Sequence, residues 1–102
     1  MAWLTRKEEV LAALDSSGRG PVADGARVLH HRALVHTLRC RGGLDVAWCV
    51  ETREGLEVRH VQVLGGHRVA WPHPRCPAVV VAEAGAFERW KLQVGDLLTV
   101  EE

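Results

Sequence analysis

The sequence contains no isoleucine, asparagine or tyrosine and only a single phenylalanine, and nearly all of its basic residues are arginines. A GC-rich bacterial genome produces this bias without any structural cause. The scarcity of Asn and Gln also fits a thermophile, although that interpretation rests on the same bias. We therefore expect a bacterial protein, and the missing residue types carry no information about its chemistry.

Features that mark membrane or exported proteins are also missing. No apolar run approaches the roughly 20 residues that a membrane-spanning helix needs. Residues 6–9 are all charged, where a signal peptide would carry its apolar segment. The three cysteines, Cys40, Cys49 and Cys76, are irregularly spaced and odd in number, which argues against a disulfide framework. We expect a cytoplasmic protein with reduced thiols and no membrane partner.

The composition predicts one ordinary globular domain over residues 1–102, at 47% hydrophobic and 25% charged residues. The formal net charge is zero, but the charges are unevenly distributed. Acidic residues are absent from the window 25–44 and from the window 58–82, and all six histidines lie in these two windows. This segregation directs attention to the basic residues inside the windows.

Glycine-containing turns recur at near-even spacing between Arg32 and Pro72, at residues 42–43, 53–55 and 65–66. The segments between them carry Val, Leu and Trp. Two-residue and short glycine turns between such segments are typical of β-hairpins. The stretch is therefore predicted to form four strands of an antiparallel β-meander.

The alternation of apolar residues assigns a face to the second of these strands. A two-residue turn at 42–43 would place Val35 opposite Val50 on the neighbouring strand. Side chains two apart share a face of a strand. The core face is therefore predicted to carry Leu44, Val46, Trp48 and Val50.

The third strand changes phase along its length. Its apolar positions alternate up to Val58 and resume in the opposite phase at Val61. One extra residue in a strand produces such a change. We expect a β-bulge near Arg59–His60.

Helices are predicted at both ends of the chain. Thr5 and Glu8 form a capping box, and the apolar residues that follow have helical spacing, which favours a helix from Thr5 to about Asp15. Ala84 to Trp90 fits about two further helical turns. The first helix has one apolar stripe, so we expect it to pack on the sheet.

Two more strands complete the predicted fold. Ala78–Ala82 is a short apolar run typical of a strand buried on both faces, and Leu97–Val100 follows a turn at Gly95. Residues 26–31 fit a strand, a loop or a helical turn. The predicted class is α+β: an antiparallel meander of about five or six strands, curved or barrel-like, with the N-terminal helix packed on it and a short helix near the C-terminus.

One candidate site is a metal centre, because His and Cys are common ligands of transition metals. His67, His73 and Cys76 lie close together in the sequence, and neighbouring prolines would hold the last two in a defined geometry. The sequence has no C-x-x-C pair and no H-E-x-x-H motif. The alternative is a rigid loop with an exposed histidine and a buried cysteine.

A second candidate is a surface for nucleic acid or another anion, built from both windows. Arginine suits phosphate because its guanidinium donates two parallel hydrogen bonds. The alternative is that the arginines simply occupy the solvated face of strands. A winged-helix variant would use helices near 5–15 and 26–40 and a hairpin at 42–57 as the wing. The candidate residues are Arg27, Arg32, Arg39, Arg41, Arg59, Arg68 and Arg75.

A third candidate is a nucleophilic thiol. The predicted register places His36 opposite Cys49, where an imidazole would lower the thiol pKa. Asp45 and Glu51 would share that face and oppose thiolate formation, and nothing in the sequence indicates an oxyanion hole.

Taken together, the patterns favour a non-catalytic binding or interaction module without a cofactor. The unpaired edges of an open meander and the four tryptophans in so small a chain suggest a homodimer. The alternatives are a nucleic-acid or anion-binding protein and a His/Cys metal-binding protein.

Overall fold

The computed structural model is built almost entirely of antiparallel strands. It describes residues 2–14, 25–29, 35–36, 43–65, 69–70 and 75–101. The helix is α1, Ala86–Trp90. The strands are β1 (Trp3–Arg6), β2 (Glu9–Ala13), β3 (Ala26–Leu29), β4 (Val35–His36), β5 (Leu44–Thr52), β6 (Gly55–Leu64), β7 (Val69–Ala70), β8 (Ala78–Glu83) and β9 (Leu97–Glu101).

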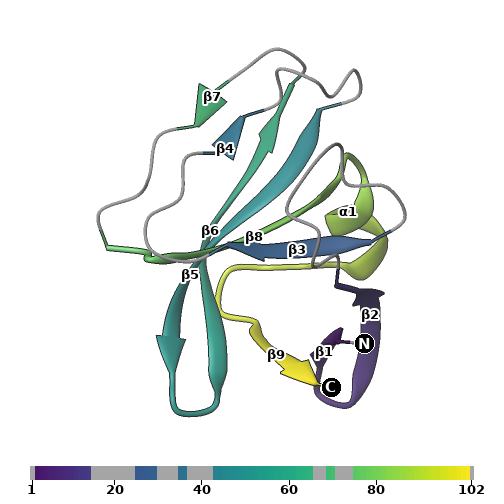
Figure 1. Cartoon of the computed structure of the whole chain (residues 1–102), viewed down its shortest axis with the longest axis vertical. Helices are drawn as coiled ribbons and strands as arrows, with labels where there is room; N and C mark the ends of the chain where they lie inside the picture. Colours follow the sequence, from purple (N-terminus) through teal and green to yellow (C-terminus); the bar gives the residue numbers. More distant parts are fainter. Residues whose placement is uncertain are drawn as a thin grey trace.

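Seven of the strands form one sheet in the order β2-β1-β9-β6-β5-β8-β3, and among the described residues β4 and β7 form a separate two-stranded sheet. The turn of the long β5–β6 hairpin points away from β4 and β7, and the two chain ends lie close together beside β1 and β9 (Figure 1). A parallel bridge between Leu14 and Ala26 connects the two ends of the sheet order. No ladder joins β2 to β3 in the part of the chain that is described, so the sheet is open.

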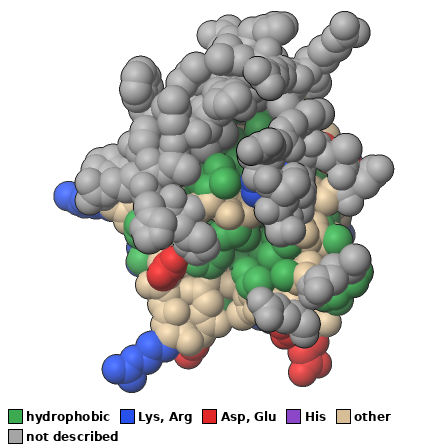
Figure 2. Space-filling model, viewed as in Figure 1, with side chains coloured by type: hydrophobic (Ala, Val, Ile, Leu, Met, Phe, Trp, Pro, Cys, Tyr) green, Lys and Arg blue, Asp and Glu red, His purple; other side chains and the backbone are tan. Residues whose placement is uncertain are grey.

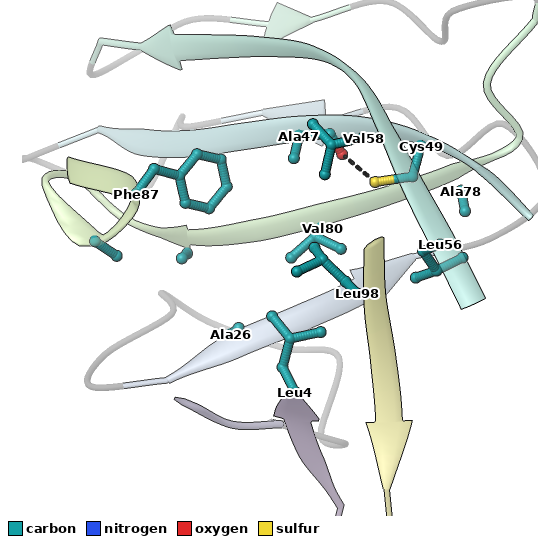
Figure 3. Packing of buried hydrophobic residues seen from close by; sticks show 12 residues of the cluster. Leu4, Ala26, Ala47, Cys49, Leu56, Val58, Ala78, Val80, Phe87 and Leu98 are labelled. Atoms are coloured by element: carbon teal, nitrogen blue, oxygen red, sulfur yellow. Dashed lines mark hydrogen bonds between the residues drawn. The ribbon is translucent and has the colours of Figure 1, made fainter. Parts of the chain in front are cut away.

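Apolar side chains on the two faces of β5 and β8 form two cores. The first core consists of Leu4, Ala26, Ala47, Cys49, Leu56, Val58, Ala78, Val80, Ala82, Ala86, Phe87 and Leu98. Figure 3 shows Phe87, Leu4 and Leu98 reaching into it from α1, β1 and β9. The second core, on the opposite face, consists of Leu44, Val46, Trp48, Leu64, Cys76, Val79 and Val81, with Leu29 and Val50 packed against it. Burial on both faces explains why Ala78–Ala82 reads as a continuous apolar run.

A buried carboxylate connects the middle of the sheet to α1. Asp45 on β5 is 3% exposed, and its Oδ2 accepts hydrogen bonds from the backbone N–H groups of Gly85 and Phe87, each at 3.0 Å. These donors stand at the start of α1, where backbone N–H groups have no partner within the helix. Asp45 therefore positions the short helix over the first core.

The predicted N-terminal helix is wrong, because this segment forms the β1–β2 hairpin. Lys7 and Glu8 turn the chain with φ angles of 49° and 70°, and neither is a residue type that marks such turns. Thr5, the expected helix cap, is instead 1% exposed, and its hydroxyl hydrogen-bonds with that of Thr99 on β9. Pairing with a distant strand thus overrides the local helical signals.

The predicted meander is also wrong beyond its central hairpin. β4 pairs with β7, Val35 standing opposite Ala70, and the second neighbour of β5 is β8. Gly43 has a φ of 79°, and a Cβ there would overlap the carbonyl oxygen of Leu64. Gly43 thus permits the start of β5 to lie close to the end of β6. The predicted pair of Val35 with Val50 does not form, because Val35 pairs with Ala70 and Val50 with Glu57.

The fold class changes accordingly from α+β to a seven-stranded open antiparallel sheet with one short helix among the described residues, instead of five or six strands curved into a barrel-like form. The winged-helix variant fails too. Its first helix is the β1–β2 hairpin, and Ala26–Leu29 is strand β3. Of the open segment 26–31, residues 26–29 are thus a strand, and residues 30 and 31 lie outside the described residues. No helix within the described ranges is long and apolar enough to cross a membrane.

Several local predictions are confirmed. Leu44, Val46 and Trp48 share the second core, with Val50 packed against it. The strand predicted at Ala78–Ala82 is β8, and the last predicted strand is β9. These features depend on alternation and turn residues within short segments.

Five large apolar side chains are exposed among the described residues. Trp3, Val10, Val63 and Val100 come from four different strands, and Val94 comes from the turn before β9. Figure 2 shows hydrophobic side chains reaching the surface in the middle of one face, with charged side chains along its lower margin. Dimerisation stays a prediction.

Candidate anion-binding pocket

A β-bulge in β6 brings two basic side chains into one place. In the β5–β6 ladder, His60 stands opposite Trp48 and Val58 stands opposite Cys49, so Arg59 is the extra residue. The bulge predicted from the change of phase is therefore confirmed. A bulge sets two residues against one on the partner strand and redirects their side chains. Consecutive Arg59 and His60 accordingly line the same cavity instead of facing opposite sides of the sheet.

The cavity has a volume of about 460 Å³ and draws its lining from three strands or their approaches. Val50 comes from β5, Arg59 and His60 from β6, and Arg75 and Cys76 from the segment that enters β8. Cys76 belongs to the second core, and Val50 packs against that core. The cavity therefore has an apolar side next to the core and a basic side toward solvent, where Arg59, His60 and Arg75 are exposed.

The described lining of the cavity includes two guanidinium groups and no carboxylate. Arg59 forms an ion pair with Glu57, whose Oε1 lies 2.8 Å from Nε of Arg59. The Arg59 side chain is 57% exposed, so solvent screens this ion pair and its contribution to stability is small. Glu57 thus offsets part of the positive charge of Arg59.

The thiol in the cavity adds no negative charge. Burial raises the pKa of Cys76, and the positive charge of Arg59 acts against that rise. Only the thiolate of a cysteine is a good nucleophile. The protonated Cys76 is therefore part of the apolar wall.

Behind the cavity, Trp48 fixes the geometry of the bulge. Its indole is 3% exposed, and its Nε1–H donates a 3.2 Å hydrogen bond to Oε1 of Gln62. Burial of the ring and satisfaction of its one donor hold β5 and β6 in register beside His60.

The structure places three of the seven arginines that were predicted to form an anion surface. Arg59 and Arg75 meet at the cavity, whereas Arg27 lies on β3 at the edge of the sheet order and is not among the described lining residues. The remaining candidates lie outside the described residues: Arg32, Arg39, Arg41 and Arg68. His60 and Val50 were not predicted as site residues, although the change of phase at Arg59–His60 pointed to the first of them.

The other two candidate sites are the metal centre and the nucleophilic thiol. For the metal centre, Cys76 lines the cavity, while His67 and His73 lie outside the described residues. No three His, Cys, Asp or Glu side chains in the described part of the chain are grouped to hold a metal ion.

The predicted pairing of His36 with Cys49 does not form. His36 pairs with Val69, and Cys49 stands between Val58 and Ala78. Burial, with a smaller contribution from Cys76, raises the pKa of Cys49 to about 12, so the thiol remains protonated at neutral pH. Its Sγ donates a hydrogen bond to the carbonyl oxygen of Ala47 within the first core (Figure 3).

No protein-family model and no curated protein matches this sequence. Two crystal structures are similar in fold. One, described as "a putative transcription regulator" from Sinorhizobium meliloti, has a TM-score of 0.64 and 17% identity, over 97% of this chain and 91% of that one. The other is a protein of unknown function from Novosphingobium aromaticivorans, with a TM-score of 0.59 and 12% identity, over 95% and 81% of the two chains. At these identities the likeness establishes a shared fold alone.

Proposed function

We propose that this protein is a non-catalytic binding module whose ligand is an anion held in the cavity at the β6 bulge. The observation that carries the proposal is the meeting of Arg59 and Arg75, from separate parts of the chain, on one cavity whose described lining has no carboxylate. Two guanidinium groups can donate several charge-assisted hydrogen bonds to a phosphate, sulfate or carboxylate. A binding role also agrees with the absence of an activated nucleophile among the described lining residues.

The test is calorimetric titration of the protein with inorganic phosphate, compared between the wild type and two arginine variants. We expect Arg59→Gln and Arg75→Gln each to weaken binding about tenfold, because each removes a charged donor from the cavity. Arg53→Gln is the matched control, since Arg53 is exposed in the β5–β6 turn and is not among the lining residues. Equal affinity in all four proteins, or no binding by any of them, would overturn the proposal.

A second candidate function is binding of nucleic acid. It is favoured by the description of the Sinorhizobium meliloti structure, by the shared fold and by the exposed arginines at the cavity. Titration of a fluorescent single-stranded oligonucleotide at several salt concentrations tests it, because each phosphate contact adds to the steepness of the salt dependence. We expect little binding above 0.1 M salt, since the formal net charge is zero. Tight binding with a steep salt dependence would instead favour this second function.

A further inference from the structure

The size of the cavity points to a ligand larger than a free inorganic anion. Sites for small organic ligands commonly enclose about 300–1,000 Å³ and combine apolar walls with a few placed polar groups. The cavity at the bulge, at about 460 Å³, lies within that range. An inorganic ion bound to the guanidinium groups would leave most of this volume to water.

The two sides of the cavity also favour two different chemical groups in a ligand. Val50 and Cys76 connect one side to the second core, and the raised pKa of Cys76 keeps that side uncharged. Arg59 and Arg75 supply charge on the other side. A ligand with an anionic head and an apolar body would contact both sides at once.

Two guanidinium groups favour a head group with more than two oxygens. Glu57 accepts from Nε of Arg59, at 2.8 Å, and does not occupy the terminal nitrogens of Arg59. The two oxygens of a carboxylate ligand are satisfied by one guanidinium in the bidentate mode. A phosphate monoester has up to two charges and three terminal oxygens, so it can engage the free side of Arg59 and the guanidinium of Arg75 together.

We propose that the cavity at the β6 bulge binds a small phosphate monoester with an apolar or aromatic body, and that Val50 contacts this body while Arg59 and Arg75 hold the phosphate. This inference rests on the proposed anion-binding function, because it names the class of ligand for the same cavity.

The test compares three probes by calorimetric titration at pH 7.5: phenyl phosphate, inorganic phosphate and benzoate. We expect phenyl phosphate to bind at least tenfold more tightly than either of the others, since it alone carries both groups. Phenyl phosphate no tighter than inorganic phosphate would overturn the inference and leave the anion-binding function in place. Benzoate as tight as phenyl phosphate would overturn the choice of phosphate. Binding of none of the three would remove the proposed function and this inference together.

Two valine variants test the contribution of the apolar wall to binding separately from that of the charges. Val50→Thr keeps the side-chain shape and introduces a hydroxyl, so we expect it to weaken the binding of phenyl phosphate about fivefold and that of inorganic phosphate much less. Val63→Thr is the matched control, because Val63 lies on β6, is 73% exposed and is not among the described lining residues. An equal effect of Val50→Thr on both probes would contradict the placement of the apolar body against Val50.

Discussion

Removal of the Asp45 carboxylate tests the link between the sheet and α1. Oδ2 of Asp45 accepts from the N–H groups of Gly85 and Phe87, and neither donor has another acceptor among the described residues. Asp45→Ala would leave both N–H groups without this acceptor, the one of Phe87 in a buried site and the one of Gly85 in a partly buried site. A buried donor that loses its partner costs about 1–3 kcal/mol, and the partly buried donor adds less because water reaches it, so we expect a loss of about 2–4 kcal/mol.

The asparagine variant separates the loss of the acceptor from the loss of the charge. Asp45→Asn keeps one side-chain oxygen that can accept from both donors, although bonds to a neutral acceptor are about half as strong. It also replaces Oδ1, which has no hydrogen-bond partner in the described structure, with an amide that needs an acceptor. We expect a loss of about 1–2 kcal/mol, smaller than the loss in Asp45→Ala.

Urea unfolding followed by far-ultraviolet circular dichroism measures both variants, with the midpoint and the slope fitted together. Glu54→Ala is the control, because Glu54 is an exposed carboxylate in the β5–β6 turn and its loss should change stability by less than about 0.5 kcal/mol. The account of Asp45 would be refuted if Asp45→Ala matched Glu54→Ala, or if Asp45→Asn proved the more damaging variant.

Two further predictions concern backbone geometry and a buried thiol. Gly43→Ala should destabilise the protein more than Gly95→Ala in urea unfolding. Both glycines have positive φ, but only at Gly43 would the new Cβ overlap the carbonyl oxygen of Leu64. Equal losses of stability in the two variants would contradict that close approach. Burial raises the pKa of Cys49 from 9.0 to about 12. Above pH 9 the thiol therefore loses its proton in the unfolded chain and keeps it in the native chain. The free energy of unfolding should consequently fall as pH rises from 9 toward 12. Cys49→Ala should flatten that fall in urea midpoints measured from pH 8 to pH 10.5, whereas parallel curves for the two proteins would refute it.

Part of the candidate site could be predicted from the sequence. The change of phase between Val58 and Val61 located the bulge, because one extra residue reverses the alternation of a strand wherever the strand lies. The arginines of the two acid-free windows were also recognised as candidates for binding an anion. The sequence did not predict that Arg59 and Arg75 would line one cavity. They do so because β8 pairs with β5, with Ala78 opposite Cys49.

The helical interpretation of the first segment failed for a related reason. A capping box and helical spacing are local signals of modest strength, and tertiary contacts override them. Here the N-terminal segment gains a hydrogen-bonded neighbour in β9 and buries Leu4 and Thr5 completely or almost so. The turn residues Lys7 and Glu8 did not indicate a hairpin in the sequence, since neither is typical of a hairpin turn with positive φ.

The sequence by itself determined the β5–β6 hairpin, the bulge within it, the apolar face of β5 and the double-sided burial of β8. These depend on alternation, turn glycines and apolar runs among neighbouring residues. Only the tertiary structure decided the strand order, the pairing of β4 with β7 and the place where Arg59, His60 and Arg75 meet. Backbone hydrogen bonds between strands do not depend on side-chain identity, so the choice of partner strand follows from the packing of the whole chain.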